Sequence, residues 1–252
     1  LERIEKGEIS RIDMDPFHEL FYKQKYSTSA ENLRDMFSNV YLWFDWSSMP
    51  QPSAQPNLGE KEKNALKEAG GRAIRSIPAY IERSDFMMIV APTGTHANRV
   101  NKSTKEPIHT CYRTWRRRGW CVLELAASYF SRDRSQPALL VRSAEGPPEW
   151  ISPMEMQKLA VGLCDFSCCE RNHVLTTATQ EATSDGKSKG DRISCDKPIV
   201  RSILVQMIRA KVNHLFATED NVAGRLFVSF RHWWLRGLNN GQVIDETDVS
   251  TI

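Results

Sequence analysis

The sequence lacks the features that define several large classes of protein. Its 252 residues contain no apolar run near the ~18 residues of a membrane span, and because the chain is charged from Glu2 onward we expect no signal peptide. The 34 basic and 31 acidic residues leave a formal charge of only +3, so neither a nucleic acid nor a membrane is expected as a partner. Six cysteines in a chain of this length do not make a disulfide scaffold, which favours reduced thiols and a cytoplasmic location.

Several catalytic motifs are also missing from the sequence. Neither standard form of Gly-rich phosphate loop occurs, so a P-loop enzyme or a Rossmann dehydrogenase is not expected. No G-x-S-x-G elbow occurs, which argues against the serine hydrolases that use it. The composition, 40% hydrophobic and 26% charged, is that of a globular protein and excludes collagen-like and wholly disordered chains.

Three short apolar runs predict the strands of a sheet. Residues 40–45 and 86–90 are almost continuously apolar, as expected of strands buried on both faces, and residues 138–141 predict a third strand. Helical patterns lie between them, including residues 120–130. This alternation predicts an α/β domain with a mostly parallel sheet, in which ligands bind beyond the carboxyl ends of the strands.

The first two predicted strands are separated by two predicted helices. The first covers residues 60–69 and ends at Gly70 and Gly71. The second carries isoleucines at helical spacing, and a proline that its first turn would tolerate. Residues 92–112 are polar and predict a long loop, which in a compact domain is usually functional or mobile.

The pattern divides the chain into three parts. Residues 1–36 form an N-terminal segment that we expect to be truncated, since the chain begins with Leu1, and that carries a helix after Asp15 and Pro16. Residues 37–142 form the α/β domain. Residues 143–252 form a mostly helical C-terminal extension, with a flexible loop near residues 178–194 and helices that begin near Asp196 and Asp220.

The most informative segment is the start of the helix predicted at residues 120–130. Trp120 and Glu124 are four residues apart and therefore share one face of this helix. The opposite face, expected to meet the sheet, carries Val122, Leu123, Ala126, Tyr129 and Phe130. Because a solvated helix face seldom carries a tryptophan, Trp120 and Glu124 together indicate the wall of a pocket.

These residues resemble a known family. The run W-C-V-L-E-L at residues 120–125 resembles the W-C-x-x-E-L signature of TIR domains, most clearly those of plant immune receptors. Residues 42–51 are similar to the W-I-D-x-x-x-I-N-Q stretch of the fungal HET domain, a TIR relative, and to an F-D-x-x-x-x-P-Q form in TIR-like families of algae and other protists. Residues 73–92 fit the helix, strand and Ser/Pro-containing loop that precede the signature. The resemblance covers residues 37–142 and implies a flavodoxin-like three-layer fold, although the first strand of that fold has only a poor candidate at residues 8–12.

The resemblance implies hydrolysis of NAD+ at the bond between nicotinamide and ribose, with NAD as the substrate and no cofactor. The transition state of this cleavage has oxocarbenium character, which a carboxylate beside the ribose stabilises. Glu124 matches the catalytic glutamate of the family. Other residues form the candidate binding set: Trp120 to stack on nicotinamide, Asp45 to bind ribose hydroxyls, Arg118 to meet the pyrophosphate, and Trp46 and Cys121 beside them.

Each of these residues also has a purely structural interpretation. Glu124 would be a surface glutamate paired with an arginine, and Trp120 would cover the edge of the sheet. Asp45 would cap the loop after its strand, Arg118 would belong to a solvated face, and Cys121 would be a small buried hydrophobe. For the whole protein, the alternative to an NAD+ hydrolase is a non-catalytic signalling or scaffold module that self-associates through TIR-like surfaces. Homo-oligomers are expected in either case.

A group of metal-ligand residue types lies in the C-terminal part. Cys164, Cys168 and Cys169 are followed by His173, and Cys195 lies further along the chain. The spacing is not the C-x2-C pairing of most structural zinc sites, so buried thiols and no metal site are predicted here.

Overall fold

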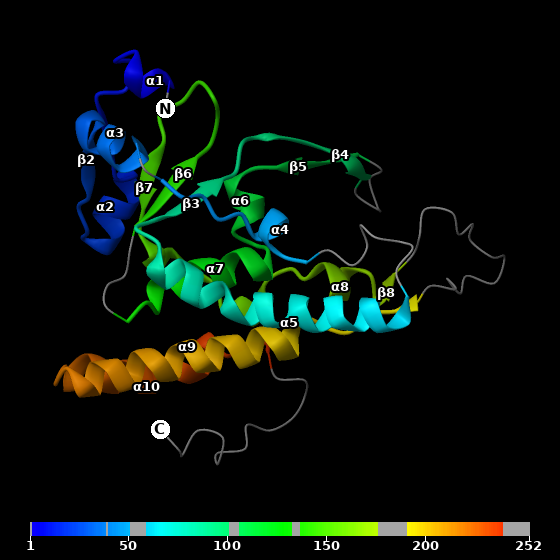
Figure 1. Ribbon diagram of the computed structural model, residues 1–252. Coiled ribbons are helices and arrows are strands. Elements are labelled where there is room, and N and C mark those ends of the chain that lie inside the picture. The colour runs from blue at the N-terminus through cyan, green and yellow to red at the C-terminus, as the bar shows by residue number, and fades with distance from the viewer. Residues whose placement is uncertain are drawn as a thin grey trace. The chain divides into compact units, whose positions relative to one another are not determined.

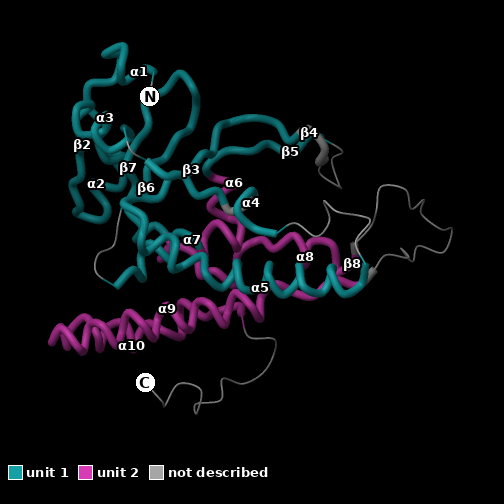
Figure 2. Tube along the Cα trace, viewed as in Figure 1, with its two compact units in different colours: residues 1–112, 124–155 teal, residues 113–123, 156–252 magenta. Residues whose placement is uncertain are grey.

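The chain is mixed α/β, with helices and several small sheets (Figure 1). The computed structural model describes residues 2–38, 40–50, 59–100, 106–132, 137–175 and 191–238. The chain divides into two compact units, coloured separately in Figure 2. Unit 1 contains residues 1–112 and 124–155, and unit 2 contains residues 113–123 and 156–252. The division follows neither of the predicted boundaries, because each unit is built from two separate stretches of chain.

The main sheet of unit 1 has three strands in the order β3-β6-β7. Strand β3 (Met87–Val90) pairs in parallel with β6 (Ala138–Val141), and β6 pairs antiparallel with β7 (Glu149–Ile151). Helix α7 (Gly119–Tyr129) lies between β3 and β6 in the chain, so these elements form a βαβ crossover. The predicted strands at residues 86–90 and 138–141, their parallel pairing and the predicted helix between them are confirmed. The prediction of a mostly parallel sheet is wrong, because β7 pairs antiparallel with β6 and makes the sheet mixed.

The strand predicted at residues 40–45 is wrong. Residues 40–44 form no strand, and residues 45–48 form the short helix α4 (Asp45–Ser48). Tyr41 is 99% exposed, and the ring of Trp43 stacks on Tyr80 with centroids 5.0 Å apart. Apolar and β-branched composition favours a strand only where a sheet edge is present to pair with it and bury it. Here Trp43 stacks on Tyr80, which belongs to the helix at residues 60–83, and does not pack in a sheet.

The helix-breaking role predicted for Gly70 and Gly71 is also wrong. A single helix, α5 (Glu60–Arg83), runs through both glycines and through Pro78. The carboxylate of Glu62 accepts a hydrogen bond from the backbone N–H of Gly59 at 3.0 Å, which satisfies a free donor at the helix start. A glycine inside a helix costs only about 1 kcal/mol relative to alanine, and tertiary contacts on the side of Ile77, which is buried, override that preference.

The loop predicted at residues 92–112 contains regular structure. Strands β4 (Gly94–Val100) and β5 (Pro107–Thr110) pair antiparallel, and the helical turn α6 (Tyr112–Trp115) follows. The hairpin could not be predicted from this polar segment, because neither strand shows the alternation of apolar and polar side chains that is typical of a half-buried strand.

The N-terminal residues belong to the core of unit 1. Their elements are α1 (Glu2–Glu5), β1 (Arg11–Asp13), α2 (Pro16–Tyr22), β2 (Ser27–Ser29) and α3 (Ala30–Ser38). Asp15 caps α2, as predicted, by accepting hydrogen bonds from the N–H groups of Phe17 and His18. A buried cluster joins this region to the main sheet through Trp150 and Leu139; its other members are Ile4, Ile9, Ile12, Met14, Ala30 and Leu33. Residues 1–36 are therefore an integral part of unit 1.

Unit 2 is dominated by two helices packed side by side, α9 (Lys197–Ala217) and α10 (Asn221–Trp234) (Figure 1). Both helices were predicted, and the carboxylate of Asp220 caps α10 by accepting a hydrogen bond from the N–H of Ala223. Shorter elements precede them: η2 (Pro153–Lys158, shared with unit 1), η3 (Val161–Leu163), α8 (Ser167–Glu170), β8 (Val174–Leu175) and β9 (Asp191–Arg192). The flexible loop predicted near residues 178–194 lies outside the described residues except for residues 191–194, which include β9.

Within the described residues, every helix is too short or too polar to cross a membrane.

Candidate functional site

Helix α7 carries the W-C-V-L-E-L run and is buried along most of its length. The predicted protein-facing residues Val122, Leu123, Ala126 and Phe130 are all buried, and Tyr129 is half-buried. Trp120 and Glu124 are half-buried on their common face. Glu124 is the only charged residue of the helix. The structure thus places Trp120 and Glu124, two half-buried residues, on one face of one helix.

The start of α7 is fixed by contacts within unit 2. The backbone N–H of Gly119 donates to the carbonyl of Asp165 at 3.0 Å, and the N–H of Asp165 donates to the carbonyl of Arg117 at 2.7 Å. A Cβ at position 119 would lie 2.2 Å from Cζ of Phe166, so only glycine lets this ring pack against the first turn. These contacts hold the helix start, and with it Trp120, in a defined position.

Trp120 is also held by a specific polar contact. Its indole Nε1–H donates to Oδ2 of Asp196 at 3.0 Å. Asp196 directly precedes α9, and its carbonyl accepts the N–H of Val200. The tryptophan is therefore anchored at its polar end rather than simply packed as an apolar side chain.

The other candidate residues on the unit 2 side of α7 have structural surroundings. Cys121 is buried, as expected of a small hydrophobe. Arg118 is exposed, and the neighbouring Arg117 forms an ion pair with Asp165, with both side chains largely accessible. The arginine run therefore has the solvated character of the structural alternative.

Asp45 and Trp46 do not follow a strand. They open α4, after Phe44 at its N-cap, and the orientation of their side chains lies outside what the structure describes. Asp45, Trp46 and Glu124 belong to unit 1, whereas Arg118, Trp120 and Cys121 belong to unit 2. The candidate residues that the structure places on a single helix are thus Trp120, Cys121 and Glu124.

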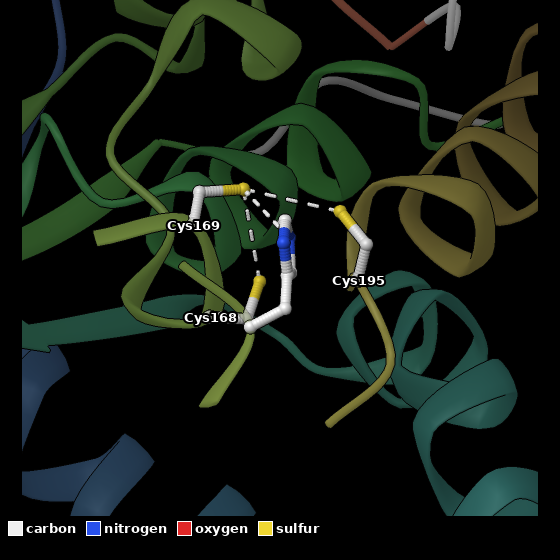
Figure 3. A group of neighbouring side chains, drawn as sticks. Cys168, Cys169 and Cys195 are labelled. Carbon is white, nitrogen blue, oxygen red and sulfur yellow. Dashed lines mark hydrogen bonds between the residues drawn. The ribbon is translucent and has the colours of Figure 1, made fainter. Parts of the chain in front are cut away.

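A second group of functional side chains is found in unit 2. Cys168, Cys169, His173 and Cys195 each direct one potential ligand atom to a common point, and these four atoms all lie within 4.8 Å of one another. The Sγ atom of Cys169 lies 3.9 Å from Sγ of Cys168, 3.9 Å from Sγ of Cys195 and 3.6 Å from Nε2 of His173. Figure 3 shows the three thiols converging. Cys168 is buried, in line with the predicted buried thiols, whereas Cys169 and Cys195 are half-buried.

Local backbone structure brings the four residues together. Helix α8 carries Cys168 and Cys169, and the N–H of His173 donates to the carbonyl of Cys168 at 2.7 Å. Asn172 and His173 both have positive φ values, 51° and 59°, which turn the chain back sharply. Strands β8 and β9 then pair antiparallel and return the chain to the cluster, so that Cys195 arrives beside α8.

The sequence contains a pattern that indicates this cluster, although it differs from the C-x2-C spacing of most structural zinc sites. Two adjacent cysteines, followed after three residues by a histidine, give three potential metal ligands within six residues. The fourth, Cys195, is distant in the sequence and is placed only by the β8–β9 pairing. Cys164 has a matching residue type but remains outside the cluster, with its thiol donating to the carbonyl of Ala160.

The environment raises the pKa of two thiols. Burial, together with hydrogen bonds to Cys195 and Cys168, raises the pKa of Cys169 to about 12. Burial and the neighbouring Asp165 carboxylate raise the pKa of Cys164 to about 12. Both thiols are therefore protonated at neutral pH as long as no cation is bound, and neither is suited to act as a free nucleophile.

Unit 1 contains a buried polar cluster that no sequence pattern indicated. The backbone N–H of Ser152 donates to Nδ1 of His18 at 3.0 Å, which leaves the neutral ring's proton on Nε2. That nitrogen lies 3.5 Å from Oε2 of Glu155, which also accepts a hydrogen bond from the hydroxyl of Tyr22 at 2.8 Å. His18 and Glu155 are 4% and 5% exposed, so this network ties α2 to the segment after β7 rather than facing a ligand.

No protein-family model, curated protein or solved structure matches this chain.

Proposed function

We propose that this chain is a TIR-like protein that cleaves the bond between nicotinamide and ribose in NAD+, with Glu124 as the catalytic carboxylate. The observation that supports the proposal most is the position of Glu124, the one charged residue on a helix that is otherwise largely buried. A half-buried carboxylate is only partly solvated, which strengthens its interaction with a positive charge that develops beside it.

The proposed chemistry needs a carboxylate close to the ribose. When the glycosidic bond breaks, nicotinamide leaves with the bonding electrons and the ribose ring acquires oxocarbenium character. Ionised Glu124 stabilises this charge, and a water molecule then completes the hydrolysis. Trp120 lies one turn earlier on the same face of α7, where its ring could stack on the nicotinamide.

Helix α7 follows β3 after the β4–β5 hairpin and α6, and it leads into β6, which pairs in parallel with β3. Glu124 is in the second turn of that helix.

The proposal includes a flavodoxin-like three-layer fold, which requires a further parallel strand beside β3. Strand β3 is at one end of the sheet order, and its side chains Met88 and Val90 are exposed.

The test is nicotinamide release from NAD+, followed by liquid chromatography over a wide range of protein concentrations, because TIR-like enzymes commonly act as assemblies. Glu124→Gln keeps the shape of the side chain and removes its charge, and should reduce turnover by about 10²-fold or more. Glu82→Gln is the matched control. Glu82 is a half-buried carboxylate of unit 1 that pairs with Arg132, and its replacement should leave turnover unchanged. Equal turnover in wild type and Glu124→Gln, or none at any concentration, would overturn the proposal.

A second candidate function is a self-associating scaffold without catalysis. The observation that favours it is the exposure of Tyr41, Leu42 and Phe44, whose side chains are 99%, 64% and 59% accessible. Three exposed apolar side chains in one short segment are typical of a surface that is covered by a partner.

Self-association can be measured by light scattering after gel filtration. We expect the wild type to form larger species as its concentration rises, and the double variant Tyr41→Ser/Phe44→Ser to remain monomeric. Leu20→Ser removes an equally exposed apolar side chain elsewhere in unit 1 and should not change the assembly. Assembly without nicotinamide release would favour the scaffold, whereas a wild type that stays monomeric at all concentrations would exclude it.

A further inference from the structure

We propose that Cys168, Cys169, His173 and Cys195 bind a single Zn²⁺ ion in a structural site of unit 2. Three thiols and one imidazole supply four ligand atoms, each from a different residue, and all four lie within 4.8 Å of one another. Three thiols and one histidine form a standard ligand set for structural zinc. This proposal is independent of the NAD+ hydrolase activity.

The distances agree with a tetrahedral ion. With Zn–S bonds of about 2.3 Å and a Zn–N bond of about 2.0–2.1 Å, a tetrahedron separates two sulfurs by about 3.8 Å and a sulfur from a nitrogen by about 3.6 Å. The Sγ atom of Cys169 lies 3.9 Å from each of the other two sulfurs and 3.6 Å from Nε2 of His173, and the remaining pairs of ligand atoms are within 4.8 Å. A disulfide would need sulfurs about 2.05 Å apart, and the cysteines are all free.

The nature of the ligands selects the metal. Thiolates are soft ligands that favour zinc, copper(I) and iron–sulfur clusters over magnesium or calcium. Four atoms so close together enclose one ion rather than a cluster of several. Four protein ligands also fill the coordination shell of zinc, which leaves no position for water or substrate and makes the site structural rather than catalytic.

The surroundings stabilise a negatively charged site. Zinc bound by three thiolates carries a net charge of −1, because each thiol releases its proton when it binds. The backbone N–H of Asp196 donates to Sγ of Cys168 at 3.4 Å, the kind of contact that stabilises a ligating thiolate. His173 is held in a left-handed conformation that few non-glycine residues adopt, with its carbonyl accepting the N–H of Ile193 at 2.9 Å. A strained residue at a convergence of ligands is typical of a functional site.

The ion would connect three parts of unit 2. It joins the turn at α8, the β8–β9 pair and the start of α9, which Cys195 precedes by two residues. Asp196, next to the fourth ligand, also accepts the hydrogen bond of Trp120. The metal site would therefore hold Asp196, the hydrogen-bond acceptor that orients Trp120. Loss of the metal should then loosen Trp120 at the start of α7.

The test begins with the metal content of the purified full chain, measured by plasma mass spectrometry without added metal. We expect about one zinc ion per chain. Chain stripped of metal and refilled with Co²⁺ should show the absorption of a tetrahedral cobalt site with thiolate charge-transfer bands. Copper or iron in place of zinc, with no uptake of Zn²⁺ or Co²⁺, would contradict the choice of metal. Absence of any bound metal, together with no cobalt spectrum, would overturn the site itself.

Variants separate ligation from packing. Cys169→Ser and His173→Ala should lose the bound zinc, and His173→Cys should retain it, because a fourth thiolate completes the tetrahedron. Cys164→Ser is the matched control: this thiol lies four residues from the cluster but bonds to the carbonyl of Ala160, so the metal content should not change. Equal zinc in wild type and in both Cys169→Ser and His173→Ala would show that these residues are not ligands. If a variant fails to fold, the cobalt spectrum of the wild type still shows whether a tetrahedral site with thiolate ligands is present.

Discussion

Replacing Trp150 with alanine is expected to lower the free energy of unfolding by about 3–5 kcal/mol, the usual cost of removing a large buried aromatic side chain. Trp150 has no exposed surface and belongs to the cluster that joins the N-terminal elements of unit 1 to its sheet. Its ring meets Tyr26 and Phe86 edge to face, with centroids 5.0 and 5.6 Å away. The measurement is urea denaturation followed by far-ultraviolet circular dichroism.

Two further variants test the cause of this loss. The indole Nε1 of Trp150 finds no hydrogen-bond partner among the described residues, so Trp150→Phe removes apolar area without breaking a hydrogen bond and should cost less than Trp150→Ala. Leu20→Ala, on a side chain that is 69% exposed, should change stability by no more than about 0.5 kcal/mol. A Trp150→Ala variant as stable as Leu20→Ala would show that residues 1–36 do not share a core with the sheet.

Replacing Gly162 with alanine is expected to destabilise unit 2 by about 3 kcal/mol or more, at the upper end of the cost of overpacking. A Cβ at this position would lie 2.4 Å from the carbonyl carbon of Gly237 and 2.5 Å from the backbone nitrogen of Leu238. These are backbone atoms, which cannot move aside as the end of a side chain can. Gly237 itself has a φ of +79°, a conformation that glycine adopts without strain.

A second glycine provides a control of opposite sign. Gly70 lies inside α5, and a Cβ there would meet only the carbonyl oxygen of Pro50 at 3.9 Å, an ordinary contact. Gly70→Ala should therefore stabilise the protein by about 0.5–1 kcal/mol through helix propensity. The thermal transitions of both variants can be compared with that of the wild type. If Gly162→Ala melts with the wild type, the close approach between residues 162 and 237 is not part of the folded chain.

The parts of the fold that could be predicted are those in which local pattern and tertiary burial agree. The apolar runs at residues 86–90 and 138–141 sit in a sheet, and the periodicity at residues 120–130 forms a helix with a buried face. Asp15 caps its helix as predicted, because the donors that it satisfies are close in sequence.

The parts that could not be predicted depend on neighbours distant in the chain. Residues 40–44 have the composition of a buried strand, but Trp43 stacks on Tyr80 and no sheet edge receives the segment. The glycines of α5 were expected to end a helix, but each costs only about 1 kcal/mol relative to alanine and α5 continues through both. Cys195 reaches Cys169 only through the pairing of β8 with β9, which no sequence pattern specified.

For the candidate site, helical spacing correctly placed Trp120 and Glu124 on one face of a helix. The contact between Trp120 and Asp196 could not be predicted from the sequence, because the two residues are distant in the chain.

The most direct test of the central claim, that Glu124 acts on the ribose of NAD+, is the rate of nicotinamide release per chain measured together with NAD+ binding. The account predicts that Glu124→Gln binds NAD+ and melts as the wild type does, yet releases nicotinamide about 10²-fold more slowly or not at all. Saturable NAD+ binding with no release by either protein, or the same rate of release from both, would contradict it.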